Sequence, residues 1–135
     1  MKKYLSLIML SLFITAGCQT QHEIATLPEA TFNRDIVIIN SAQLNQYWSP
    51  QTLKPVMLNK RPDWLPKGAG KGEYYQTIDS NGNEVSKTLI SSTPEGWMTQ
   101  ALLNKMPKQQ FKPTAQNDKW LPVKVKLEFE VKRMN

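Results

Sequence analysis

The clearest pattern in this chain is an alternation of apolar and charged residues near its C-terminal end. Apolar residues stand at every second position from Val123 to Val131, and lysines and glutamates fill the positions between them. Because successive side chains of a β-strand point to opposite faces, this period of two predicts a strand over 123–131. One face of that strand is expected to pack on a core, and the charged face is expected to contact water.

A β-hairpin is predicted upstream of this strand. Residues 73–78 are rich in aromatic and β-branched side chains, and residues 84–91 form a second extended run. Asn81-Gly82 between them is a strong short-range indication of a tight hairpin turn, because both residues tolerate a positive φ. The two runs are therefore expected to pair as antiparallel strands.

A helix is predicted over 94–106. Thr93 stands where an N-cap is expected, Pro94 suits the first helical position, and Pro107 would end the helix. Apolar residues, among them Trp97, recur inside this segment at helical spacing. Together these elements predict an α+β fold, a small antiparallel sheet with one covering helix in the order β-β-α-β.

The N-terminal segment has the composition of a bacterial secretion signal. Lys2 and Lys3 are followed by the apolar run 5–14 and by small residues before Cys18. The apolar run is much shorter than the roughly 20 residues that a membrane-spanning helix requires. Residues 1–17 are therefore expected to be a cleaved signal peptide.

Thr15-Ala16-Gly17-Cys18 resembles the lipobox of bacterial lipoproteins, although that family usually has Leu where Thr15 stands. The resemblance implies membrane attachment through a lipid on Cys18; the alternative is an ordinary cleaved signal that leaves Cys18 free. Cys18 is the only cysteine of the chain, so no internal disulfide can form. In the lipoprotein family an Asp after the cysteine retains the protein at the inner membrane. Gln19 stands there instead, which implies an outer-membrane lipoprotein that faces the periplasm.

Two segments separate this anchor from the predicted domain. Residues 18–34 carry few large apolar side chains and are expected to form a flexible tether. Residues 35–60 contain a β-branched run, then Ser41 as the cap of a short helical turn through Trp48, then several prolines. They are expected to form an extended lead-in with a possible strand and a short helix.

The composition gives little support for enzymatic, metal-binding or nucleic-acid functions. The net charge is +6, but the basic residues are scattered, so no nucleic-acid partner is expected. His22 is the only histidine and lies in the tether, which leaves no base for a histidine-dependent triad. Residues 79–84 resemble the start of a calcium loop but are better explained as a turn, and 67–72 resembles a phosphate loop but leads into a strand. No catalytic residue, metal site or cofactor is therefore expected, and a small hydrolase is the least favoured function.

The chain from about residue 61 to 131 resembles the C-terminal domain of TonB and its relatives. No single piece of the resemblance is specific, but six pieces occur in the family's order and spacing, and they assign 61–135 to a TonB C-terminal-like domain. The pieces are Arg61-Pro62-Asp63-Trp64-Leu65-Pro66, the glycine-led strand from Gly70 to Asp79, Asn81-Gly82-Asn83-Glu84-Val85, Ser91-Ser92, Phe111-Lys112-Pro113 and Pro122-Val123-Lys124-Val125.

This resemblance implies a β-β-α-β domain that works by protein contact in the periplasm. In TonB the domain binds a short extended segment of an outer-membrane transporter by adding a strand to its sheet. Here Leu121–Val131 would be the edge strand, and the segment around Trp64 would lie close to the partner. The expected partner-binding residues are Trp64, Leu65, Pro66, Val123, Val125, Leu127 and Phe129.

An energy-transducing TonB also has a membrane-spanning helix and a long proline-rich spacer, neither of which this sequence predicts. We therefore expect a lipid-anchored protein that binds an envelope protein or a transporter segment, without energy transduction by this chain alone. The alternative is a structural or assembly lipoprotein whose sheet edge supports a homodimer or contacts the cell wall. Trp64 and Trp120 stand at element ends, where they are either packed or part of a binding surface, and Trp97 is expected in the core.

Overall fold

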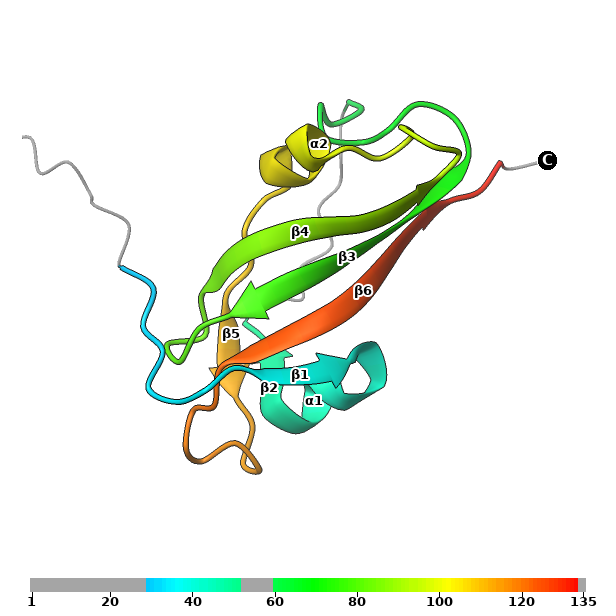
Figure 1. Cartoon of the computed structure of the whole chain (residues 1–135). Coiled ribbons are helices and arrows are strands. Elements are labelled where there is room, and N and C mark those ends of the chain that lie inside the picture. Colours follow the sequence, from blue (N-terminus) through cyan, green and yellow to red (C-terminus); the bar gives the residue numbers. More distant parts are fainter. Residues whose placement is uncertain (1–28, 52–59, 134–135) are drawn as a thin grey trace, which may run out of the picture.

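The computed structural model describes residues 29–51 and 60–133 (Figure 1). The predicted signal peptide, Cys18 and most of the predicted tether lie outside these residues. No helix within the described ranges is long and apolar enough to cross a membrane. In chain order the elements are β1 (Val37–Asn40), the 3-10 helix η1 (Ser41–Gln43), α1 (Leu44–Tyr47), β2 (Trp48–Pro50), β3 (Gly70–Ile78), β4 (Glu84–Thr93), α2 (Gln100–Lys105), β5 (Phe111–Pro113) and β6 (Val123–Val131).

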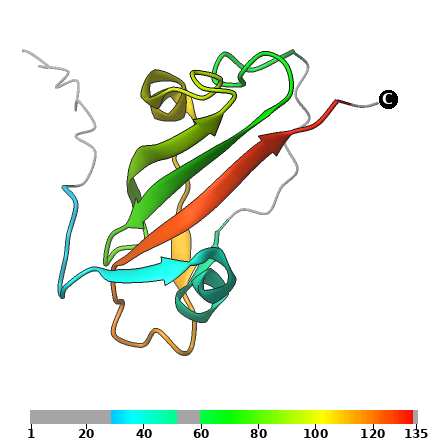
Figure 2. The ribbon, with the colours of Figure 1, turned by 45° about the vertical axis from the view of Figure 1, so that its right-hand side comes forward.

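Four strands form one sheet in the order β1-β6-β3-β4 (Figures 1 and 2). β3 is antiparallel to both β4 and β6, whereas β1 runs parallel to β6. The α+β class, the hairpin and the C-terminal strand predicted from the sequence are confirmed. The prediction of an antiparallel sheet is wrong in one respect, because β1 joins it in parallel and makes it mixed.

The first of two cores lies where β1 and the beginning of β6 meet a small second sheet of β2 and β5. Each buried apolar side chain in this core stabilises the fold by roughly 1.5–3 kcal/mol. The polar edge of the largest, Trp48, is satisfied because its Nε1 donates to the carbonyl of Leu121 at 3.0 Å. The buried members are Ile39, Trp48, Ile78, Phe111, Val123 and Val125.

The second core lies under α2, which covers the part of the sheet formed by β3 and β4 (Figure 1). Tyr74, Met98 and Leu103 are buried there, and Leu127 and Phe129 of β6 pack against them. Burial raises the pKa of the Tyr74 hydroxyl, and the nearby Glu84 carboxylate raises it further. The covering helix predicted from the sequence is thus present, but it covers one end of the sheet only.

α2 is shorter than the predicted helix. It begins after Thr99, whose hydroxyl caps it, and the expected cap Thr93 is instead the last residue of β4. Between them the chain makes a turn in which the Trp97 amide donates to the Pro94 carbonyl at 3.0 Å. Gly96 adopts a φ of 74° in this turn, a conformation that no helix residue has. The helical spacing of the apolar residues continues through the turn, which is why the sequence pattern extends the helix too far.

Part of the predicted tether is bound to the domain. The Thr31 amide donates to the Asp79 carboxylate at 3.2 Å, and the Asn33 amide donates to the Ser80 hydroxyl at 3.0 Å. Asp79 and Ser80 are buried in the hairpin turn between β3 and β4. The folded unit therefore begins before residue 35, and the expected lead-in contributes β1 and Trp48 to the domain itself.

Candidate functional site

The side of β6 that faces away from β3 is closed along one half of the strand and open along the other. β1 pairs with this side over Val123–Lys126, and within the described parts of the chain no strand pairs with it beyond Lys126. Figure 1 shows β1 ending part-way along β6, which continues toward the C-terminus. The prediction that Leu121–Val131 forms a free edge is therefore wrong for the first half, because β1 occupies it. We call Leu127–Val131 the open half of β6.

The strand register determines which backbone groups the open half presents. The Val37 amide of β1 donates to the Pro122 carbonyl at 3.0 Å, so the peptide groups of even-numbered residues of β6 point toward this side. Peptide groups alternate along a strand, and β6 pairs with β3 without a register shift. The N–H and C=O groups of Glu128 and Glu130 therefore also point outward, where an added strand could bind them.

An aromatic cluster lies on the covered face of the open half. The Trp64 and Phe129 rings meet edge to face with centroids 5.9 Å apart, and the Trp97 ring stacks on Phe129 at 6.1 Å. We call Trp64, Trp97 and Phe129 the aromatic cluster. Aromatic contacts of this kind add about 0.5–1.5 kcal/mol per pair beyond the area that they bury. The cluster therefore gives the open half a well-packed apolar surface on one face.

The position of Trp97 depends on a glycine in β3. A Cβ atom added to Gly70 would lie 2.4 Å from Cδ2 of the Trp97 ring, which is closer than any real contact. The indole Nε1 also donates to the Gly68 carbonyl at 3.2 Å. Gly70 thus permits the close approach that holds Trp97 against Phe129.

Trp64 is presented by a turn that Arg61 closes. The Leu65 amide donates to the Pro62 carbonyl at 3.1 Å, and the Arg61 guanidinium donates to the carbonyls of Leu65, at 3.2 Å, and Pro66. A charged donor makes stronger hydrogen bonds than a neutral one, so Arg61 restrains this turn. Residues 61–66, one of the six pieces on which the expected resemblance rests, therefore form a compact turn beside the open half.

The structure brings together some of the predicted partner-binding residues and separates others. Trp64 contacts Phe129, and Leu127 packs against both cores. Val123 and Val125 are instead fully buried in the first core, under the half of β6 that β1 closes. Their side chains cannot contact a partner without unfolding, so of the four predicted strand residues only Leu127 and Phe129 lie on the open half. Pro66 is also buried, and Leu65 is half-buried in the turn that carries Trp64.

The opposite face of the sheet is charged. Lys71 Nζ lies 2.8 Å from the Glu128 carboxylate, and Lys126 Nζ lies 3.4 Å from the Glu73 carboxylate. The hydrogen bond to Glu128 raises the pKa of Lys71. Hydrogen bonds from Ser91 and then Lys126 lower the pKa of Glu73. These pairs are exposed to solvent, so they contribute little to the free energy of unfolding. Their main effect is to keep this face of the sheet polar and hydrated.

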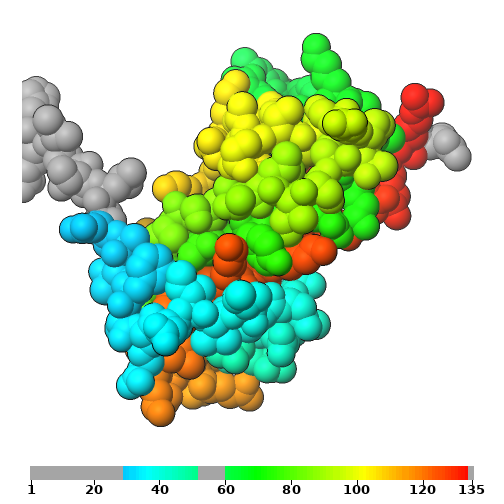
Figure 3. Space-filling model, viewed as in Figure 1, coloured from blue at the N-terminus to red at the C-terminus, as the bar shows by residue number. Residues whose placement is uncertain are grey.

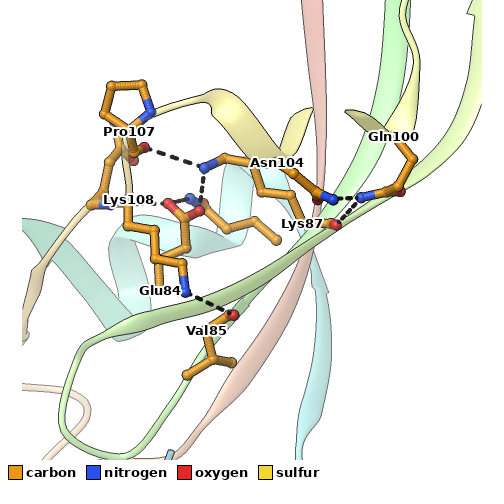
Figure 4. A network of polar contacts seen from close by, with 9 residues as sticks. Glu84, Val85, Lys87, Gln100, Asn104, Pro107 and Lys108 are labelled. Carbon is orange, nitrogen blue, oxygen red and sulfur yellow. Dashed lines mark hydrogen bonds and ion pairs between the residues drawn. The ribbon is translucent and has the colours of Figure 1, made fainter. Parts of the chain in front are cut away.

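The other edge of the sheet, formed by β4, is capped by a side chain that the sequence did not indicate. Gln100 of α2 donates through Nε2 to the Lys87 carbonyl at 2.7 Å and accepts through Oε1 from the Leu89 amide at 2.8 Å. Figure 4 shows the contact to Lys87 and, beside it, Lys108 reaching the Val85 carbonyl. One amide side chain thus satisfies two backbone groups of the edge, as a neighbouring strand would. This role depends on how α2 docks, which leaves no trace in the local sequence.

A buried ion pair is formed by two residues of β4 itself (Figure 4). Glu84 pairs with Lys87, and its carboxylate accepts from Gln76 Nε2 at 2.7 Å and from the Gln109 amide at 3.0 Å. Lys87 Nζ also donates to the Pro107 carbonyl at 3.3 Å. The hydrogen-bond partners of this pair are a side chain of β3 and backbone groups of residues 107–109. The ion pair therefore connects β4 to β3 and to the segment after α2. A hollow of about 240 Å³ lies next to it.

Comparisons with protein-family models, with curated proteins and with solved structures found no match for this chain. The described residues hold no group of three or more side chains suited to bind a metal ion. Cys18, the predicted lipidation site, lies outside the described residues. Among the described residues, the open half of β6 has no paired strand on its outer side and has the aromatic cluster on one face.

Proposed function

We propose that this chain is a lipid-anchored protein of the cell envelope, held in the outer membrane through Cys18 and facing the periplasm. Its TonB-C-like domain binds an extended segment of another envelope protein by strand addition. The observation that carries this proposal is the open half of β6, where the described chain provides no pairing strand beyond Lys126. A sheet edge whose backbone groups are paired along only part of its length can accept a further strand along the rest.

An added strand would meet two different surfaces. Its backbone would bond to the outward peptide groups of Glu128 and Glu130, which gives affinity without sequence preference. Its side chains would point alternately toward the aromatic cluster and toward the charged face with Glu128 and Lys71. We therefore expect a partner segment in which apolar and polar residues alternate, such as an extended segment of an outer-membrane transporter. The proposal includes no catalytic step and no energy transduction.

A proline substitution tests the strand addition directly. Glu130→Pro removes an outward N–H that β3 does not use, and a proline is tolerated at a sheet edge. We expect it to weaken binding of an extended transporter peptide about tenfold, since it removes one hydrogen bond and disturbs its neighbour. Glu130→Gln keeps the N–H while removing the same charge, so it should bind within a factor of about two. Isothermal titration calorimetry of the two variants and the unchanged chain measures this difference.

Equal affinities of the proline and glutamine variants would overturn strand addition at this edge. Sedimentation of the peptide-free protein at several concentrations distinguishes the alternative, a homodimer, from partner binding. A dimer that Glu130→Pro dissociates would use the open half for self-association.

The membrane location is tested by Gln19→Asp. The lipoprotein family's sorting rule predicts that this variant moves from the outer to the inner membrane in fractionated cells, and an unchanged location would contradict that part of the proposal.

A further inference from the structure

Large apolar side chains are exposed at the end of the molecule where the predicted anchor enters. Phe32 is 44% exposed, Ile36 42%, Ile38 73% and Trp120 44%. Ile90, at 41%, is the remaining exposed large apolar side chain among the described residues, and it lies on β4 at the far edge of the sheet. Four of the five therefore belong to only two short segments of the chain.

These two segments lie side by side. Asn33 Nδ2 donates to the Lys119 carbonyl at 3.1 Å, and the Val37 amide donates to the Pro122 carbonyl at 3.0 Å. Ile36 and Ile38 are two positions apart in extended backbone, so their side chains point the same way. Figure 3 shows the segment that contains them, in blue and cyan, next to the orange loop at one end of the molecule. We call Phe32, Ile36, Ile38 and Trp120 the apolar end surface.

Trp120 has a backbone conformation that is unusual for a bulky residue. Its φ is 52°, in the left-handed region that costs a non-glycine residue about 1–2 kcal/mol. Its ring meets the Trp48 ring edge to face, with centroids 6.3 Å apart. Strain of this kind persists where the surrounding structure fixes the residue, and here the Trp120 amide donates to the Asn117 carbonyl at 3.1 Å while the ring contacts Trp48. The remainder of the indole is exposed at this end of the molecule.

The chain between this surface and the predicted lipid is short. Cys18 precedes Phe32 by 14 positions, so even a fully extended chain between them reaches at most about 50 Å. Arg34, Lys119 and Lys124 lie within or next to the apolar end surface, and the exposed Asp35 and Asp118 in the same segments leave a small positive balance toward an anionic lipid headgroup layer. Tryptophan and phenylalanine beside basic residues are the side chains that favour the membrane interface.

We propose that the apolar end surface rests on the bilayer in which the protein is anchored. This inference rests on the proposed membrane anchoring, but not on strand addition. β6 starts at this end and rises about 3.3 Å per residue, so Glu130 would lie roughly 20–25 Å further from the bilayer than Val123 if the strand stands upright. The docked domain would then hold the open half of β6 away from the lipid, toward partners in the periplasm.

A tethered fluorescence experiment tests the docking without requiring the natural lipid. Both cores and their hydrogen bonds lie within residues 29–133, so a chain that starts at Gln19 contains the whole folded domain. An N-terminal histidine tag attaches this chain to vesicles of phosphatidylcholine, phosphatidylglycerol and a nickel-chelating lipid. The chain lacks Cys18 and hence any cysteine, so Ile38→Cys or Ile90→Cys carries a single environment-sensitive fluorophore.

We expect a lipid-borne quencher to quench the fluorophore several-fold more strongly at position 38 than at position 90. These two positions are a matched pair, because both are exposed isoleucines of the same sheet at opposite edges. Phe32→Ser and Trp120→Gly should each lower the quenching at position 38 toward the level at position 90. Glycine at position 120 also relieves the left-handed backbone, which offsets part of the packing lost with the Trp48 contact, and circular dichroism of this variant checks that it is folded.

Equal quenching at positions 38 and 90 would overturn the proposal. It would also be overturned if the fluorophore at position 38 became shielded in vesicle-free solution as the protein concentration rises, because a second copy would then cover the surface. The mass of the N-terminal peptide from cells tests the lipid on Cys18 separately. A missing lipid there would contradict the anchor and leave the tethered result intact, so the two failures are distinguishable.

Discussion

The two halves of β6 share one sequence pattern but have different surroundings. In the first half, Val123 and Val125 are fully buried between β1, β3 and the small second sheet. In the second half, Leu127 and Phe129 alternate with charged residues in the same way, yet they are only half-buried, and the described chain leaves their outer side unpaired. The difference in edge pairing comes from β1, a strand of four residues that lies more than 80 positions earlier in the sequence, and the difference in burial comes also from the small second sheet.

The largest expected difference between the halves concerns their tryptophans. Trp48→Ala empties the first core and leaves the Leu121 carbonyl without its indole donor, so we expect a loss of about 3–5 kcal/mol in the free energy of unfolding. Trp64→Ala removes a half-buried ring beside the open half and should cost about 1–2 kcal/mol. Urea unfolding followed by circular dichroism measures both. Equal losses would show that the two halves are not differently packed.

A smaller effect is expected within the open half itself. Gly70→Ala places a methyl group inside the Trp97 ring and should cost about 1–3 kcal/mol, because the ring must leave Phe129. Gly68→Ala is the control, since its Cβ would meet no neighbour and only the positive φ of 78° would be strained, at about 1 kcal/mol. Near-ultraviolet circular dichroism should change for Gly70→Ala and stay unchanged for Gly68→Ala. A Gly70→Ala variant with the native aromatic signal would contradict the described cluster.

The smallest expected effect concerns the charged face. The pKa of Glu73 is lowered by hydrogen bonds from Ser91 and Lys126, so its carboxylate stabilises the folded state above its unfolded pKa near 4.5. That stability is lost as the pH falls through the lowered folded value. Glu73→Gln should therefore flatten the acid side of the stability curve and change little at neutral pH, and Glu95→Gln on the turn after β4 is the control. A curve for Glu73→Gln that falls as steeply as that of the unchanged chain would contradict this account.

The sequence predicts well those elements whose signals are local. The Asn81-Gly82 turn and the alternation over 123–131 specify the hairpin and β6, because turn chemistry and strand period act over a few residues. The start of α2 is less well predicted, since Thr93 and Thr99 both resemble caps and the Gly96 turn preserves the apolar spacing. A short helix before residue 48 is also predicted, although Asn40 and not Ser41 caps it.

The features that matter most for binding depend on long-range contacts. Val37–Asn40 reads as a generic β-branched run, and nothing in its sequence indicates that it pairs in parallel with the start of β6. The contact of Trp64 with Phe129 brings a predicted pair of residues together, whereas the capping of β4 by Gln100 has no counterpart in the sequence pattern. Periodicity indicates which face of a strand is buried, but it does not indicate which edge is free.

Amide hydrogen exchange along β6 tests the half-open edge most directly. The parallel register directs the Lys124 and Lys126 amides toward β1, and it directs the Glu128 and Glu130 amides outward, where the described chain has no partner. We predict that Lys124 and Lys126 exchange as slowly as Leu127 and Phe129, which face β3, whereas Glu128 and Glu130 exchange rapidly in the free protein. Protection of Glu128 and Glu130 equal to that of Lys124, with no partner present, would contradict the account, because the edge would then already be paired.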